Sequence, residues 1–301
     1  MNAALLTSIS MKGLTMISAL IDPFTFAFMQ RGLIAALIVG IICSLIGCFV
    51  VIRSMAFLGD AMAHAILPGI AIAYILGSSL ILGALIAAVI IALGIGFLSK
   101  QAKIKEDTAI GILFTAALAV GIAIMSTIRA FAIDLTHILF GNILGVSNKD
   151  VIFVAVMGGI ILILLIIFFK EFMIISFDPV FAFTQKIRVN FFNNFLLILL
   201  SLTIVMSIQT VGVVLVTAML VTPGAAAYLI SRKLKQMMFI SAGFGILSSI
   251  AGLYLSYYAN ISSGSAIVLS ATVIFLVVFL FSPGKGLLIK KIKSIIRSRQ
   301  V

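Results

Sequence analysis

The chain consists mainly of long apolar runs that are separated by short polar segments. Most runs hold close to the roughly 20 apolar residues that an α-helix needs to cross the hydrocarbon core of a bilayer. The pattern therefore predicts nine membrane-spanning helices with short connections. The predicted spans are residues 32–52, 55–77, 80–98, 108–128, 150–169, 194–209, 211–230, 237–258 and 264–282.

Composition supports this prediction. The 301 residues are 63% hydrophobic and 9% charged, whereas a soluble domain carries about 25% charged residues. The mean hydropathy is +1.38. We predict an all-α polytopic membrane protein with a single transmembrane domain over residues 1–301.

Cys43 and Cys48 lie inside an apolar run without zinc-ligand neighbours and are interpreted as small hydrophobic side chains.

The net charge of +12 predicts an orientation rather than a nucleic-acid partner. If the C-terminus is cytoplasmic and the spans alternate, nearly all Lys and Arg residues lie inside, as the positive-inside rule requires. The basic tail over 284–301 then lies against the anionic cytoplasmic leaflet. Residues 1–30 lie outside, as an interfacial segment or as an extra helix. The basic residues placed outside are Lys12, Arg31, Arg129 and Lys149.

The second predicted span contains an acid, an imidazole and a helix breaker. Asp60 and His64 are four residues apart and share a helix face, and Pro68 and Gly69 follow one turn later. An ionisable side chain inside a span costs at least about 2.5–3.5 kcal/mol and therefore faces a cavity or a partner. A carboxylate and an imidazole can bind one divalent cation together, and an interrupted helix can lend carbonyl oxygens or room to move.

A second interpretation of these residues stays open. Asp60 can cap a helix near the cytoplasmic mouth, and His64 can be hydrogen-bonded within the bundle. Two ligands do not complete a metal site, so further ligands must come from elsewhere in the fold or from a second copy of the chain.

Other polar residues are weaker candidates for a pathway or gate. Asp134 and His137 lie three apart in the outer segment 129–149, either as a solvated pair or near an outer gate. Thr217 and Thr222 are expected to bond to local backbone groups. Residues 222–224 repeat the Pro-Gly pattern in another span, but the flanking residues differ, so no paired site is predicted.

One cytoplasmic connection, residues 170–193, is long, basic and aromatic. Asp178 and Pro179 can start a short helix there. Such a helix can rest on lipid or dock on a partner protein. The residues assigned to a docking contact are Phe177, Asp178, Pro179, Phe181, Phe183 and Gln185.

Five motifs occur in an order that resembles a known family. They are "FMQRGLIAAL" (28–37), "GDAMAHAILPGIAIAYILG" (59–77), "LFGNILGVS" (139–147), "FDPVFAFTQKI" (177–187) and "VGVVLVTAMLVTPGAAAYLI" (211–230). The chain resembles the permease subunit of the manganese/zinc/iron ABC importers, the ABC-3 family. The resemblance implies the type II ABC importer (vitamin B12 importer-like) permease fold, with about 8–10 transmembrane helices, in a bacterial cytoplasmic membrane.

The resemblance also implies partners and roles. A second copy of the permease would complete the pathway, two cytoplasmic ATPase subunits would bind below, and an extracytoplasmic metal-binding protein would deliver the ion. Asp60 and His64 would lie on the permeation pathway near the dimer axis, and residues 177–187 would touch the ATPase. No cofactor would be permanently bound, because the metal is the transported substrate. The segment "HAILPG" resembles the manganese and iron members more than the zinc members, which more often lack this proline, so Mn²⁺ is expected ahead of Zn²⁺ or Fe²⁺.

Two other classes of protein were compared with this interpretation. An intramembrane metalloprotease needs an HExxH motif, which the chain lacks. An ATP-independent secondary transporter or channel remains the alternative. The chain has no GxxxxGK[ST] motif, so it is not expected to be an enzyme, and ATP hydrolysis would require a separate subunit.

Overall fold

The computed structural model describes residues 22–127 and 143–282. Every regular element in these two ranges is a helix. The elements are η1 (Asp22–Thr25), α2 (Ala27–Ile52), α3 (Leu58–Ala65), α4 (Leu67–Ile75), α5 (Leu80–Ala102), α6 (Glu106–Ser126), η2 (Ile143–Gly145), α8 (Asn148–Ile167), α9 (Phe169–Phe177), α10 (Pro179–Thr184), α11 (Val189–Val211), α12 (Val213–Ile230), α13 (Leu234–Ala259) and α14 (Ser263–Phe281).

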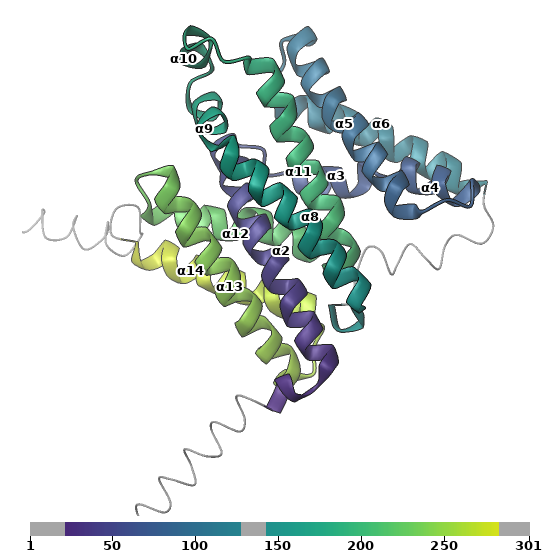
Figure 1. Ribbon diagram of the computed structural model, residues 1–301, viewed down its shortest axis with the longest axis vertical. Helices are drawn as coiled ribbons and strands as arrows, with labels where there is room; N and C mark the ends of the chain where they lie inside the picture. The colour runs from purple at the N-terminus through teal and green to yellow at the C-terminus, as the bar shows by residue number, and fades with distance from the viewer. Residues whose placement is uncertain (1–21, 128–142, 283–301) are drawn as a thin grey trace, which may run out of the picture.

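The long helices form two groups around a shared centre (Figure 1). Helix α2 packs on α12 and α13, which in turn pack on α14, while α3 to α6 pack among themselves. Helix α11 joins the groups through its contacts with α2 and α5, and α8 packs on both α2 and α11. Within the described ranges nine spans are long and apolar enough to cross a membrane, with α3 and α4 counted together. The predicted number of spans is therefore confirmed.

The second span is broken at Ile66, between α3 and α4. Pro68 has no N–H to donate to the carbonyl oxygen of His64, four residues earlier, so one hydrogen bond of a regular helix is missing at the break. The other Pro-Gly pair behaves differently, because Pro223 lies inside α12 and the helix continues to Ile230. Of the two Pro-Gly pairs, only the first lies at a break in its span.

Gly69 has a different role from the one expected. A Cβ atom on Gly69 would overlap the carbonyl oxygen of Gly83, and one on Gly83 would overlap that of Gly69. These two glycines therefore let the backbones of α4 and α5 touch, as small residues do in membrane helix pairs. Gly69 fixes the packing of α4, and the interruption itself belongs to Ile66 and Pro68.

One end of the bundle, which we call the α10 end, carries α9 and α10 together with the start of α11 (Figure 1). The predicted connection 170–193 is largely helical, because α9 begins directly after a kink at Phe168 and α11 begins at Val189. Lys235 at the start of α13 lies 5.8 Å from the ring centroid of Phe169, which places the α12–α13 connection at the same end.

Several expectations fall outside the described residues. The outer pair Asp134 and His137, residues 1–21 and the basic tail over 284–301 are among them. The first span begins earlier than predicted, so residues 27–30 belong to α2 and not to the preceding segment.

Candidate metal-binding site

Asp60 and His64 lie on α3 as the spacing predicts. The Nδ1 atom of His64 is 2.9 Å from the backbone carbonyl oxygen of Asp60 and 3.9 Å from its carboxylate oxygen Oδ1. The tautomer with a proton on Nδ1 donates to that carbonyl, which leaves the lone pair of Nε2 as a metal ligand. This backbone contact fixes the orientation of the imidazole ring relative to α3.

Both side chains are accessible on a helix that is otherwise largely buried. The side chain of Asp60 is 62% exposed and that of His64 is 28% exposed, whereas Met62 between them is fully buried. A carboxylate that faces outward from a membrane-spanning segment needs an aqueous cavity or a polar partner. The structure therefore orients the acid toward a space that this one chain does not fill.

Helices α6 and α12 form the walls beside this pair. The ring of Phe114 on α6 lies edge-on to the His64 imidazole, with a centroid separation of 6.0 Å. Gly121, two turns further along α6, packs against the break, since a Cβ atom there would lie 3.2 Å from Pro68 Cδ. On the other side, a Cβ atom on Gly59 would lie 3.4 Å from Thr217 Cγ2 of α12.

Thr217 and Thr222, the two threonines named as weaker candidates, both lie on α12. The hydroxyl of Thr217 donates to the Val214 carbonyl oxygen at 3.0 Å, as expected for a threonine that satisfies its own helix. Thr222 lies half-buried further along α12. The described ranges contain no group of three or more His, Cys, Asp or Glu side chains that could hold a metal. Within them, Asp60 and His64 form a pair of candidate ligands of different chemistry.

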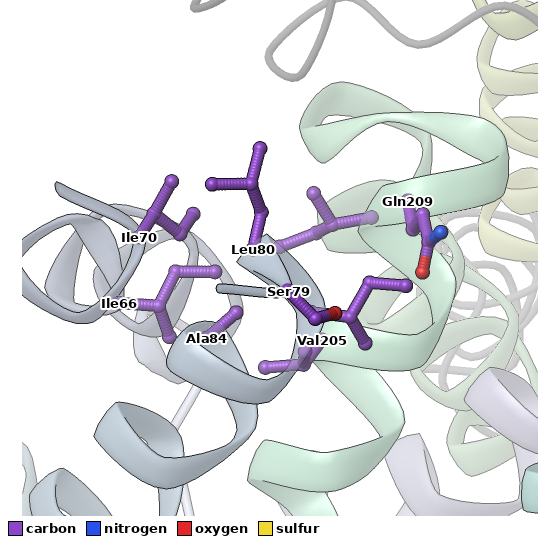
Figure 2. A pocket seen from close by; sticks show the side chains of 9 residues that line it. Ile66, Ile70, Ser79, Leu80, Ala84, Val205 and Gln209 are labelled. Carbon is purple, nitrogen blue, oxygen red and sulfur yellow. The ribbon is translucent and has the colours of Figure 1, made fainter. Parts of the chain in front are cut away.

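A cavity of about 460 Å³ lies between α4, α5 and α11 (Figure 2). Ile66 and Ile70 line it from α4 and the preceding break, and Ser79 and Gln209 contribute its polar atoms. No ionisable side chain lines this cavity, and neither Asp60 nor His64 reaches it. The cavity is therefore not the candidate metal site.

The short helix α10 forms as the sequence predicts. The Asp178 carboxylate accepts hydrogen bonds from the backbone N–H groups of Val180 and Phe181 at 3.0 and 2.9 Å, and Pro179 occupies the first turn. Ala182 is buried, whereas Phe177, Phe181 and Phe183 are exposed. Because an exposed cluster of large aromatic side chains is typical of an interaction surface, α10 presents a candidate docking face.

An aromatic cluster supports α10 from inside the bundle. Phe168 and Phe172, from the kink and α9, pack on Phe192 and Phe195 of α11, with ring centroids 5.4–6.2 Å apart. Phe49 of α2 packs edge-on against Phe172 at 6.2 Å. Sequence reasoning identified the aromatic character of this segment but not these partners.

Sequence reasoning also missed a buried polar cluster at the α10 end. Nη2 of Arg53 is 2.9 Å from Glu106 Oε1, Nδ2 of Asn193 is 2.7 Å from the same oxygen, and Arg53 also donates to Asn193 Oδ1. Burial lowers the pKa of Arg53, and the Glu106 carboxylate opposes that shift. The sequence signal was that Glu106 lies just before one predicted span and Arg53 just after another, with both residues on the predicted cytoplasmic side.

The fold and the exposed acid–imidazole pair define a helical membrane protein built to pass a polar or charged solute. A family model described as the ABC 3 transport family matches residues 25–282. The chain belongs to this family, which confirms the resemblance seen in its motifs.

Individual relatives agree with this assignment. The chain is 47% identical over 264 residues to the manganese transport system membrane protein MntC of Halalkalibacterium halodurans, covering 88% of this chain and 90% of MntC. It is 41% identical over 263 residues to a probable iron transport system membrane protein of Haemophilus influenzae, covering 87% and 97% of the two chains. The solved structure of PsaBC from Streptococcus pneumoniae in complex with Fab superposes with a TM-score of 0.78 at 42% identity, covering 89% of this chain and 97% of that one. The expected all-helical ABC permease fold is thereby confirmed.

Proposed function

We propose that this protein is the transmembrane permease subunit of an ATP-driven importer of divalent transition metal ions, and that Mn²⁺ is its main substrate. The observation that carries the proposal is the exposed Asp60 carboxylate beside the oriented His64 imidazole. Membership of the ABC 3 transport family and the similarity to a manganese permease support it. The similarity to an iron permease makes Fe²⁺ the next substrate to test.

A second copy of the chain would complete the metal site. Two ligands per chain leave a divalent ion under-coordinated, because Mn²⁺ favours several oxygen ligands with imidazole in support. Two copies that meet along α3 would bring two carboxylates and two imidazoles together and would enclose the exposed Asp60 side chains. A site with water or carbonyl oxygens in the remaining positions binds weakly enough to release the ion.

The energy for transport would come from two ATPase subunits that bind the exposed aromatic face of α10. This places the α10 end in the cytoplasm, in agreement with its high content of Lys and Arg. The opposite end, which includes the start of α8, would face outside and receive the ion from a metal-binding protein. The protein would sit in a bacterial cytoplasmic membrane with its C-terminus inside.

The proposal is tested with the two ligands. The full chain is reconstituted with its ATPase subunit and metal-binding protein in vesicles, and ATP-driven Mn²⁺ uptake is measured. Asp60→Asn keeps the size of the side chain but removes the charge, and His64→Ala removes the imidazole. Because each variant removes one of two ligands per chain, we expect each to lower uptake at least tenfold, on the order of the loss seen even for groups that support metal ligands.

The matched control is Asp107→Asn, which removes an exposed carboxylate at the start of α6. It should leave Mn²⁺ uptake unchanged. Near-normal uptake by both ligand variants would show that Asp60 is a helix cap and His64 a packing residue. Uptake by the permease without ATPase or ATP would favour a secondary transporter or channel.

A further inference from the structure

The buried cluster of Arg53, Glu106 and Asn193 joins three helices at the α10 end. Arg53 follows the last residue of α2, Glu106 is the first residue of α6, and Asn193 lies in the first turns of α11. The side chains of Arg53 and Glu106 are only 11% and 19% exposed. The three contacts form a closed triangle in which each residue bonds to both of the others.

Stability alone is a weak reason for such a cluster. Burying an ion pair costs desolvation that the attraction between the charges often only balances, so apolar packing would serve the fold as well. A buried, hydrogen-bonded ion pair does fix the relative position of the segments that carry it, because its geometry is directional. The helices that the cluster joins are therefore more informative about its role than its contribution to stability.

The cluster is connected to the docking helix through α11. Asn193 sits between Phe192 and Phe195, which pack on Phe168 and Phe172 next to and within α9. Helix α9 leads directly into α10 through Asp178. A force applied to α10 thus reaches Asn193 through contacts between rings and through the backbone.

The cluster is also connected to the candidate metal site by two routes. Arg53 is followed after a short link by α3, which carries Asp60 and His64. Glu106 begins α6, whose Phe114 packs against the His64 ring. The helix that carries the acid–imidazole pair therefore follows Arg53 after a short link, and one of the two helices beside the pair begins at Glu106.

We propose that Arg53, Glu106 and Asn193 form a joint that transmits movement of α10 to α3 and α6 and so positions Asp60 and His64. The proposal rests on the proposed function, because it assigns the movement of α10 to an ATPase. The three residues are positioning residues and do not bind the metal. In this joint, Asn193 connects the cluster to α11 and through α11 to α10. The Arg53–Glu106 ion pair connects the link that leads into α3 with the start of α6.

The test removes the contacts of Asn193 and leaves Arg53 and Glu106 paired with each other. Asn193→Ala removes the link to α11 but keeps the Arg53–Glu106 ion pair. Mn²⁺ uptake and ATP hydrolysis are measured in the same vesicles that contain the complete importer, and the ratio of Mn²⁺ moved per ATP is calculated. We expect this ratio to fall at least about tenfold, because the variant loses both hydrogen bonds of Asn193 to charged groups, while hydrolysis continues.

The matched control is Asn194→Ala, one position along the same helix. Asn194 packs on Gly96 of α5 and takes no part in the cluster. In this variant the ratio of Mn²⁺ moved per ATP should equal that of the wild type. A structural role would lower uptake and hydrolysis together and leave the ratio unchanged.

The outcomes separate the two proposals. A wild-type complex without ATP-driven Mn²⁺ uptake would overturn the proposed function and the joint together. Normal wild-type uptake with an unchanged ratio in Asn193→Ala, or an equal fall in Asn194→Ala, would overturn the joint alone. Failure of Asn193→Ala and of the milder Asn193→Ser to assemble would show that the cluster only maintains the fold, which also overturns the joint.

Discussion

Replacing Gly47 by alanine should force two central helices apart. Gly47 lies on α2 where this helix crosses α12, and a Cβ atom there would overlap the carbonyl oxygen of Leu220. The same Cβ atom would lie 2.8 Å from the Leu220 carbonyl carbon and 3.2 Å from its Cα. All three atoms belong to the backbone, so no change of rotamer can relieve the overlap.

The expected cost follows from this geometry. Contacts between carbon atoms are optimal near 3.5–4.0 Å, so α2 and α12 must separate by on the order of 1 Å, which weakens the contacts around the crossing. Overpacking of this kind costs about 1–3 kcal/mol, and the better helix propensity of alanine returns up to about 1 kcal/mol. We therefore expect Gly47→Ala to destabilise the protein by about 1–2 kcal/mol.

Gly111→Ala is the matched control. Gly111 lies inside α6, and a Cβ atom there would meet nothing within 4 Å. Only the propensity term applies, so this variant should be neutral or more stable by up to about 1 kcal/mol. The two substitutions are chemically identical and are predicted to have opposite signs.

The assay uses the two cysteines of the chain. Cys43 and Cys48 lie on either side of Gly47 on α2, and both are free and fully buried. A thiol-reactive fluorophore therefore reports the loss of tertiary structure on heating. Gly47→Ala should lower the midpoint of this transition by roughly 2–3 °C. A midpoint equal to or above that of the wild type, or an equal decrease in Gly111→Ala, would refute the packing argument.

Two further predictions concern α10 and the orientation of the bundle. Phe181→Asp places a charge in the aromatic docking face and should abolish ATPase association and uptake while the permease stays folded. If Phe181→Asp still binds the ATPase and transports Mn²⁺, α10 is only a lipid-facing surface. In intact cells an impermeant thiol reagent should label Asn148→Cys, at the start of α8, but not Gln185→Cys, which follows α10. The buried native cysteines should stay unlabelled, and labelling of Gln185→Cys alone would reverse the proposed orientation.

Local sequence was sufficient for the features that depend on one segment. Each apolar run predicts its own span, because the transfer of a helix into a bilayer is close to a sum over its residues. The start of α10 could be predicted because Asp178 bonds to N–H groups two and three residues away. The shared face of Asp60 and His64 follows in the same way from the repeat of the helix.

Tertiary structure decided the features that join distant segments. Arg53, Glu106 and Asn193 lie far apart in the chain, and no pattern near any one of them predicts that they meet. The role of Gly69 depends on Gly83 across the α4–α5 contact, and a single helix pattern cannot show which backbone will approach it.

The orientation of the Asp60 side chain depends on the fold in the same way. Helical spacing puts it on one face with His64, but only the packing of α6 and α12 on α3 determines which face stays uncovered. Hydrophobicity selects which segments enter the membrane and acts on each segment separately. Close packing selects their neighbours, and it depends on the shapes of both surfaces in contact.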